Sequence, residues 1–257
     1  MKLKLFIVAL FCSVLSWGQI AAWDFTGEGS TTNTTSTADV YNASLDASNL
    51  LTRGAGAAYS GAGNSFRTVG FQNNGIATTN TDYFQFTLSA SAGNTLSLTT
   101  LDARFAGTAT FAASPGVSSQ FAYSLDGTNF TLIASSQITI GTPATLTQIN
   151  LSSISALQNV SDAITITIRY YASGQTTTGG WGFNSPTSGQ YGLAIGGLFL
   201  LQLQIQLQQI LQFQVVLFVL MRQLVLLFLC LLQVQVHLLG ILIQLNYQML
   251  LEVLLLL

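Results

Sequence analysis

The chain has 257 residues and a formal net charge of −2, with charged residues at only 6% of its positions and hydrophobic residues at 49%. This length allows one large domain or two small ones with a substantial core. The apolar excess lies at the two ends, and the segment between them, 19–197, contains no Cys, Lys or His. That segment therefore has no disulfide framework, no zinc site of the usual kind and no His-based triad, and lacking a basic patch it is not expected to bind nucleic acid.

The N-terminal segment has the pattern of a secretory signal peptide. Two lysines precede the apolar run LFIVALF, and the small residues Ser16 and Gly18 precede a cleavage point before Gln19. We predict that residues 1–18 are removed and that the mature protein is secreted or displayed at the cell surface. A buried first helix is the alternative, which so short an apolar run directly behind two lysines disfavours.

Short alternating runs follow, and alternation places every second side chain on the same face of a strand. The opening AWDF is expected to be a strand, and INLSSISALQNV allows one helical turn. The residues that share a face in the later runs are Phe84, Phe86 and Leu88; Leu96 and Leu98; and Ile164, Ile166, Ile168 and Tyr170, with Thr165, Thr167 and Arg169 opposite. These patterns predict half-buried antiparallel strands.

The stretch QFAYSLDGTNFTLIA predicts a β-hairpin. Phe121, Tyr123 and Leu125 alternate up to Asp126-Gly127, and the alternation is expected to resume at Phe130 and Leu132. Asp-Gly tolerates the positive φ that hairpin turns need, so we assign Asp126 and Gly127 to the turn.

Turn-forming residues separate many short strands, and no long helix fits between them. The breaks fall at 54–63, 73–75, 114–116, 141–143 and 174–180. We therefore predict an all-β fold for 19–197, an antiparallel β-sandwich of jelly-roll type.

The acidic residues of this segment, one Glu and seven Asp, form no recognisable catalytic pair. Asp126 is explained by its turn, while Asp102 and Arg104 are two apart on one strand face and are expected to form an ion pair. We predict no catalytic residues. Calcium is the one cofactor considered, because jelly-roll domains often bind it through oxygen ligands, although the sequence has no D-x-D-x-D-G loop.

Aromatic residues give the candidate ligand contacts. Trp181 lies in the glycine-rich stretch GQTTTGGWGFNSPTSGQYG, and loops at the ends of a sandwich commonly carry binding residues. Together with Tyr171 and Tyr191 it is a candidate platform for sugar rings of a polysaccharide or cell-surface glycan. Aromatics at strand periodicity also belong to protein cores, and that interpretation stays open.

Seven segments carry a resemblance: AWDFTGEGS, NLLTRGAGAAYS, NSFRTVGFQNNGI, DYFQFTLSASAGNTLSL, SQFAYSLDGTNFTLI, RYYASGQTTTGGWGF and YGLAIGG. Over 20–197 the chain resembles a β-sandwich module at the front of large secreted proteins of Bacteroidetes-type bacteria. The resemblance implies a scaffold followed by a nuclease, hydrolase or lamin-tail-like module and a sorting domain for the type IX secretion system, so the secretion machinery is an implied partner. It transfers no catalytic residue, and where the family commonly has Asp-Asn after the last strand this chain has Gly196-Gly197.

The last segment, 198–257, is rich in Leu and Gln and contains no Ala, Ser, Thr, Pro, Asp or Lys. A membrane span needs about 18 or more apolar residues in a row. The best window, 215–232, is interrupted by Arg222 and Gln223, and Gln recurs through the rest at a cost in hydrocarbon. A membrane anchor through this tail is therefore one alternative.

We favour the interpretation that the tail is translated in a shifted reading frame. Gln codons read one base earlier give Ser, Thr, Pro or Ala, and Leu codons give the same residues or hydrophobic β formers. LQLQIQLQ is thus compatible with a Thr-Pro linker such as TTPNPTPT, as expected after a secreted domain. We predict that the tail is a poorly packed helix or is irregular and unstructured, and we assign no role to Cys230, His237 or Glu252.

The sequence is compatible with three functions. The first is a non-catalytic accessory β-sandwich of an exported bacterial protein, with adhesion or glycan contact as its activity. The second is the front end of a secreted hydrolase or nuclease whose catalytic domain the tail has replaced. The third is a surface protein anchored in a membrane through 198–257.

Overall fold

The computed structural model describes residues 18–29 and 33–255. The predicted signal peptide, apart from Gly18, lies outside the described residues. The chain divides after Gln202 into two compact units.

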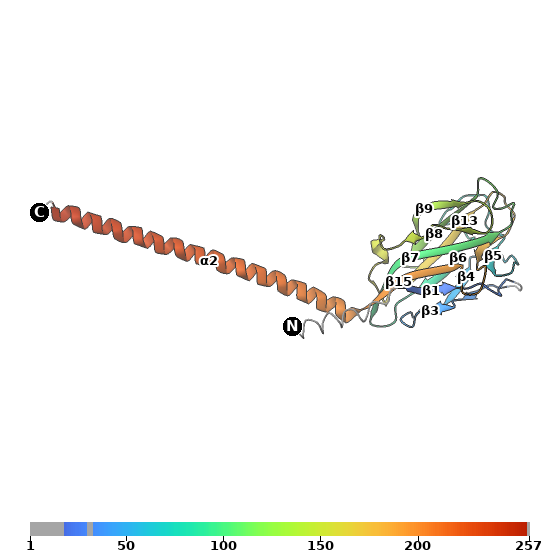
Figure 1. Ribbon diagram of the computed structural model, residues 1–257, viewed down its shortest axis with the longest axis horizontal. Coiled ribbons are helices and arrows are strands. Elements are labelled where there is room, and N and C mark those ends of the chain that lie inside the picture. Colours follow the sequence, from blue (N-terminus) through green and yellow to red (C-terminus); the bar gives the residue numbers. More distant parts are fainter. Residues whose placement is uncertain (1–17, 30–32, 256–257) are drawn as a thin grey trace. The chain divides into compact units, whose positions relative to one another are not determined.

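Two antiparallel β-sheets make up the first unit (Figure 1), which confirms the antiparallel β-sandwich architecture. The nine-stranded sheet runs β3 (Val40–Tyr41), β1 (Gly18–Trp23), β15 (Leu193–Leu201), β7 (Asn94–Gly107), β14 (Trp181–Asn184) and β5 (Ser65–Thr68), and β10 (Ala144–Thr145), β11 (Ile149–Asn150) and β12 (Val160–Ser161) also pair with β7. The six-stranded sheet runs β2 (Ser36–Thr37), β4 (Leu50–Arg53), β6 (Phe84–Leu88), β13 (Ile166–Ser173), β8 (Val117–Ser124) and β9 (Thr131–Thr139). The predicted helical turn is the 3₁₀ turn η1 (Ser155–Leu157).

The 14-residue strand β7 organises the larger sheet. Residues 94–103 of β7 pair with β15, and Phe105 pairs with Phe183 of β14. Phe105 also pairs with Ala144 of β10, so the short strands β10, β11 and β12 follow the other side of β7. Both sides of this strand are therefore hydrogen-bonded along much of its length.

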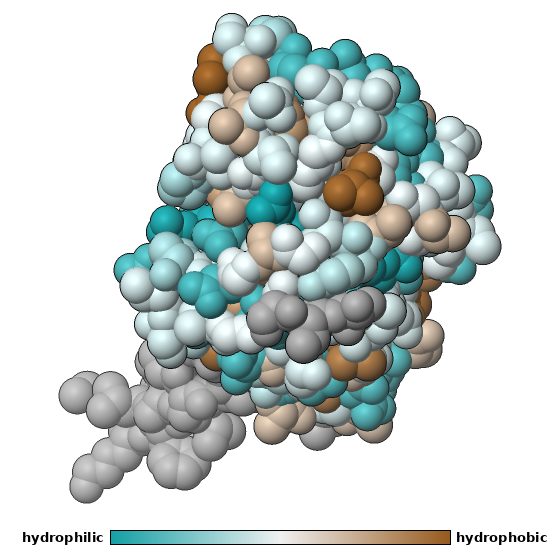
Figure 2. Space-filling model, turned by 90° about the vertical axis from the view of Figure 1, so that its right-hand side faces the viewer, coloured by the Kyte–Doolittle hydropathy of each residue, from teal (hydrophilic) through white to brown (hydrophobic). Residues whose placement is uncertain are grey.

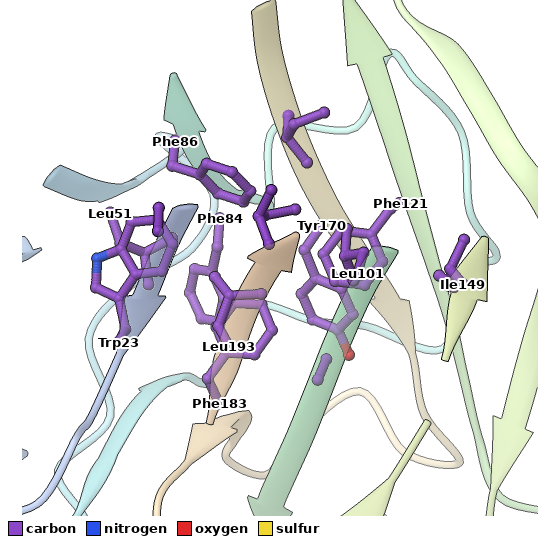
Figure 3. Close-up of a cluster of buried hydrophobic side chains, with 14 of the residues drawn as sticks. Trp23, Leu51, Phe84, Phe86, Leu101, Phe121, Ile149, Tyr170, Phe183 and Leu193 are labelled. Carbon is purple, nitrogen blue, oxygen red and sulfur yellow. The ribbon is translucent and has the colours of Figure 1, made fainter. Parts of the chain in front are cut away.

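Polar and apolar residues separate as the alternating runs predict. Figure 2 shows one face of the molecule, on which hydrophilic and near-neutral residues predominate and strongly hydrophobic ones form small separate patches. The apolar side chains gather between the sheets (Figure 3), and every residue of the described core cluster lies between Ile20 and Phe199. The β-sandwich thus has a complete core of its own, which is the physical basis for treating 19–202 as an independently folding part.

Aromatic side chains form the centre of this core. Tyr170 lies 5.0 Å, between ring centroids, from both Phe105 and Phe183. Its hydroxyl accepts a hydrogen bond from Trp181 Nε1 at 2.9 Å and also bonds Ser119 Oγ at 2.8 Å. The phenol and the indole are fully buried with their polar atoms paired, as buried aromatic residues require.

The predicted hairpin of β8 and β9 is present, with one correction. Gly127 adopts a φ of +73° in the connecting loop, as predicted. The alternation does not resume at Leu132, however, because Leu132 is 37% exposed while Ile133 is buried. Ile133 pairs with the buried Phe121 and Leu132 pairs with Ala122, so the odd-numbered residues of this part of β9 share the core face of Phe121.

The C-terminal boundary of the β-sandwich also needs correction. β15 does not end at Gly197 but continues in register with β7 to Leu201, which pairs with Asn94. Phe199 pairs with Leu96 and is only 8% exposed. The sandwich therefore extends about four residues past the predicted limit, until α2 begins.

The second unit, from Leu203 onward, is formed by the helix α2 (Gln202–Leu255), which is one of the two forms expected for the tail. Leu and Gln are strong helix formers and Pro is absent, which favours a continuous helix. Its large apolar side chains between Leu207 and Leu251 remain 41–70% exposed. Gln209–Leu251, 43 residues, is long and apolar enough to cross a membrane, and at a rise of about 1.5 Å per residue it would measure roughly 65 Å, about twice a hydrocarbon core.

Candidate functional site

The predicted platform of Trp181, Tyr171 and Tyr191 does not form an exposed surface. The glycine-rich loop ends at Gly180, and Trp181 begins β14 with its indole stacked 5.4 Å from the ring of Phe105. Its side chain is fully buried, so the expectation that Trp181 contacts a ligand is corrected to a core role.

Tyr171 and Tyr191 belong to different sheets. Tyr171 lies on β13 and is fully buried, with its hydroxyl donating to the carbonyl oxygen of Thr78 at 3.2 Å. Tyr191 is half-buried and directly precedes Gly192 and the start of β15 in the other sheet. The two rings therefore contribute to no common binding surface.

Asp126 and Asp102 both accept hydrogen bonds from other residues of the sandwich. Asp126 accepts hydrogen bonds from the backbone N–H groups of Thr128 and Asn129 at 2.8 and 2.7 Å, which confirms its role in the turn. The expected ion pair between Asp102 and Arg104 is absent from the described structure. Asp102 instead accepts from the amide of Gln148, and Arg104 donates to Gln190.

A cation between two aromatic rings marks the outer face of the six-stranded sheet. Because Ile168 and Tyr170 of β13 face the core, Arg169 points to the opposite side. Its guanidinium carbon lies 3.8 Å from the ring centroids of both Tyr83 and Phe130, and its Nε donates to Gln85 Oε1 at 2.8 Å. Tyr83, Arg169 and Phe130 are each half-buried, so this aromatic stack is partly accessible to solvent.

A polar hollow begins one residue before Tyr83, at Asp82. It encloses about 280 Å³ and is lined by Gly56, Gly70, Gln72, Asn74, Thr79, Asn80, Thr81 and Asp82. No cationic or large apolar side chain lines it. We call this feature the Asp82 hollow.

Asp82 is the buried member of the hollow, only 8% exposed. Burial raises the pKa of its carboxyl group, and hydrogen bonds from the backbone N–H groups of Asp82 itself and Gln72 partly oppose that rise. The second carboxylate oxygen, Oδ2, is buried without a hydrogen-bond partner. Such an orphan oxygen is costly, and it is a common sign of a missing ligand, ion or water.

The loop that forms the hollow is fixed on the outer face of the sheet. Gly56 N–H donates to the Thr81 carbonyl at 2.9 Å, Gly75 N–H to Ser173 Oγ at 3.1 Å, and Asn80 Nδ2 to the Gly75 carbonyl at 3.1 Å. A Cβ at Gly70 would lie 2.0 Å from the carbonyl oxygen of Gly56, so the two chain segments approach where only glycine fits. Tyr171 supports this loop from beneath through Thr78.

Sequence reasoning missed Asp82, although a signal was present. The stretch NNGIATTNTD combines amide, hydroxyl and carboxyl side chains over ten positions directly before a strand. Such a stretch resembles an ordinary polar loop unless the burial of its one carboxylate is known.

The other buried cation of the sandwich, Arg53, has a structural role. Its guanidinium carbon lies 3.7 Å from the centroid of Phe66, and it donates to the carbonyl oxygens of Asn33 and Arg67 at 3.0 and 2.6 Å. Burial lowers the pKa of Arg53 to about 10. Its Nη2 also donates to Asn33 Oδ1 at 3.4 Å, so all three guanidinium nitrogens hold neighbouring loops in place.

Larger hollows occur along α2, but they are grooves between neighbouring side chains of one helix. One of them encloses about 430 Å³ and is lined by Leu232, Gln235, Val236, Leu238, Leu239 and Leu242. A single polar side chain does not make a binding site there. Within the described residues, no group of three His, Cys, Asp or Glu side chains could hold a metal ion.

Comparisons with known proteins find no family model and no curated protein that matches this chain. The aromatic stack and the Asp82 hollow are therefore the two features of this chain from which we infer a function.

Proposed function

We propose that residues 19–201 form a non-catalytic accessory module of an exported bacterial protein, and that it binds polysaccharide or cell-surface glycan. The observation that carries the proposal is the position of the Tyr83–Arg169–Phe130 stack beside the Asp82 hollow on one sheet face. Sugar rings offer apolar faces to aromatic side chains and hydroxyl groups to carboxylate and amide oxygens. The two features supply both kinds of contact.

Export follows from the signal-peptide pattern, and the start of the fold is compatible with it. Cleavage before Gln19 would leave β1 nearly whole, since Gly18 is its first residue and Ile20 its first buried one. The mature chain would then begin within the outer part of the sandwich.

We also propose that the sandwich is of jelly-roll type. The order β1, β15, β7 and then β10 to β12 in one sheet, opposite β6, β13, β8 and β9 in the other, supports this assignment. β15 lies between β1 and β7 in one sheet and β13 lies between β6 and β8 in the other, so strands distant in sequence are neighbours in both, as Greek keys require. The short strands β2, β3, β4, β5 and β14 then are additions to that plan.

The test is binding of segment 19–202 to an array of bacterial, plant and animal glycans, followed by titration of each hit. We expect saturable binding, weakened at least about tenfold by Tyr83→Ala or Phe130→Ala, which corresponds to about 1.4 kcal/mol. Tyr191→Ala, in the other sheet, is the matched control and should bind like the parent. Absence of binding across the array, or equal weakening by all three variants, would overturn the proposal.

A second candidate, attachment to a membrane through α2, is favoured by one observation. Gln209–Leu251 has the length and composition of a membrane-crossing helix, with its apolar side chains exposed. Resequencing of the gene and detergent partitioning of the chain distinguish this candidate from a tail that is read in a shifted frame.

A further inference from the structure

The Asp82 carboxylate lacks the partner that a buried charge requires. Oδ2 has no hydrogen-bond donor, and the side chain is only 8% exposed. Within 18–29 and 33–255, no Lys, Arg or His lines the hollow, so no described side chain there neutralises the carboxylate. A buried ionised carboxylate without a counter-charge is strongly disfavoured, and metal coordination is one of the few ways to hold it.

The other lining groups are oxygen donors suited to a hard cation. Gln72, Asn74 and Asn80 carry amide oxygens, and Thr79 and Thr81 carry hydroxyls. Ca²⁺ takes six to eight such ligands in flexible geometry, whereas Mg²⁺ is smaller, demands near-ideal octahedral geometry and gives up water reluctantly. The set therefore favours Ca²⁺.

We propose that the Asp82 hollow binds one Ca²⁺ ion, with the Asp82 carboxylate as its anionic ligand and loop oxygens completing the inner part of the coordination shell. The outward positions of the ion face the mouth of the hollow and remain for water or for sugar hydroxyls. This deepens the proposed function, because the ion would supply a contact for the glycan beside Tyr83. The binding of Ca²⁺ itself does not depend on that function.

A site with a single carboxylate should be weak. Few anionic ligands give dissociation constants on the order of 10⁻⁴–10⁻³ M, the range of extracellular calcium modules. Such a site would be filled outside a cell and nearly empty at the low Ca²⁺ of a cytosol, which fits an exported domain.

The first experiment titrates CaCl₂ into metal-free segment 19–202 by calorimetry, without any glycan. We expect one saturable site, and a rise in Tm of roughly 3–6 °C at about 10 mM CaCl₂. MgCl₂ should produce less than half of that rise. Absence of saturable Ca²⁺ binding up to about 10 mM, ten times the weaker limit above, would overturn the inference.

The decisive variant is Asp82→Asn, which keeps the shape of the side chain and removes its charge. It should fold, because an amide is less costly to bury than an unpaired carboxylate, and it should lose the calcium-dependent rise in Tm. Asp126→Asn, at an exposed turn away from the hollow, is the matched control and should keep the rise. Equal Ca²⁺ binding by the parent and Asp82→Asn would contradict the assignment.

A final comparison separates the two proposals. Ca²⁺ binding by the segment together with a blank glycan array would leave the ion site intact and remove the glycan function. Glycan binding that is unchanged by EDTA and by Asp82→Asn, with no Ca²⁺ binding, would leave the glycan function and remove the ion site.

Discussion

The β-sandwich and helix α2 are both rich in apolar residues, yet only the sandwich buries them. In the sandwich, Phe105, Tyr170 and Trp181 are at most 1% exposed and contact one another. In α2, comparable side chains such as Phe218 and Phe228 are 70% and 62% exposed. The difference teaches that hydrophobic composition alone does not build a domain, because burial needs a periodic pattern that brings apolar faces together.

The largest expected contrast concerns the identity of the tail. Phe199 is buried in register with β7, so the reading frame should be correct at least through this residue. We predict that resequencing the gene from the Tyr191 codon onward will reveal an inserted or missing base between the codons of Phe199 and Gln202, followed by a Thr-Pro linker. An unchanged sequence would mean that α2 is a genuine part of the protein.

The next expected contrast is between the full chain and the β-sandwich alone in their partitioning into detergent. Residues 19–257 should partition into the detergent phase, because α2 exposes apolar side chains along its length, while segment 19–202 should stay in the aqueous phase. Detergent phase separation measures the partitioning of each chain, and circular dichroism of the separated chains measures their helix content. Aqueous behaviour of the full chain would contradict an exposed apolar helix.

The end of β15 should affect stability strongly. A chain that ends at Gly197 loses four paired residues, including Phe199, and should unfold with a free energy at least about 3 kcal/mol lower than a chain that ends at Leu201. Urea denaturation of the two segments measures the difference. Phe199→Ala in the longer segment is the control, and it should account for most of the loss.

Tyr170→Phe should have an intermediate effect. The hydroxyl links Ser119 Oγ and Trp181 Nε1, and removing it leaves the buried indole N–H without an acceptor. We expect a loss of about 1–3 kcal/mol in the free energy of unfolding. The matched control is Tyr191→Phe at a half-buried position, which should change stability little.

Tyr170 is also expected to make the stability of the sandwich fall at alkaline pH. Burial raises the pKa of Tyr170 above its ordinary value of 10.0. The stability due to the protonated phenol is therefore complete below about pH 10 and is lost as the pH rises above it. Stability measured between neutral and alkaline pH should fall less steeply in Tyr170→Phe than in the parent.

The smallest effect is expected at the turn. Hydrogen bonds from the backbone and side chain of Asn129 and the backbone of Thr128 lower the pKa of Asp126. The stability from its carboxylate should be present above pH 3.8 and be lost as the pH falls through the lowered pKa. Asp126→Asn should therefore weaken the acid dependence of the urea midpoint, and an unchanged dependence would contradict this assignment.

Much of the sandwich could be predicted because strand signals are local. The buried faces of Phe84, Phe86 and Leu88 and of Leu96 and Leu98 follow from alternation, and the turn at Gly127 follows from Asp-Gly. The phase of β9 could not be predicted, since it depends on the pairing of Ile133 with Phe121 across the loop that joins the two strands.

The candidate site was predicted less well than the fold. Trp181 and Tyr171 have the aromatic character of ligand contacts, but their burial is decided by Phe105 and by the loop at Thr78, both distant in sequence. Asp82 has the character of a surface residue, and only the closure of the Gly56 and Gly70 segments around it makes it buried.

The sequence by itself determined the antiparallel strands and the turn at Asp126, because each depends on backbone hydrogen bonds and side-chain preferences over a few residues. Only the tertiary structure decided which aromatic residues are core, where β15 ends, and that one carboxylate oxygen lies buried without a partner. Those outcomes depend on contacts between residues far apart in the chain, where burial and desolvation set the free energy.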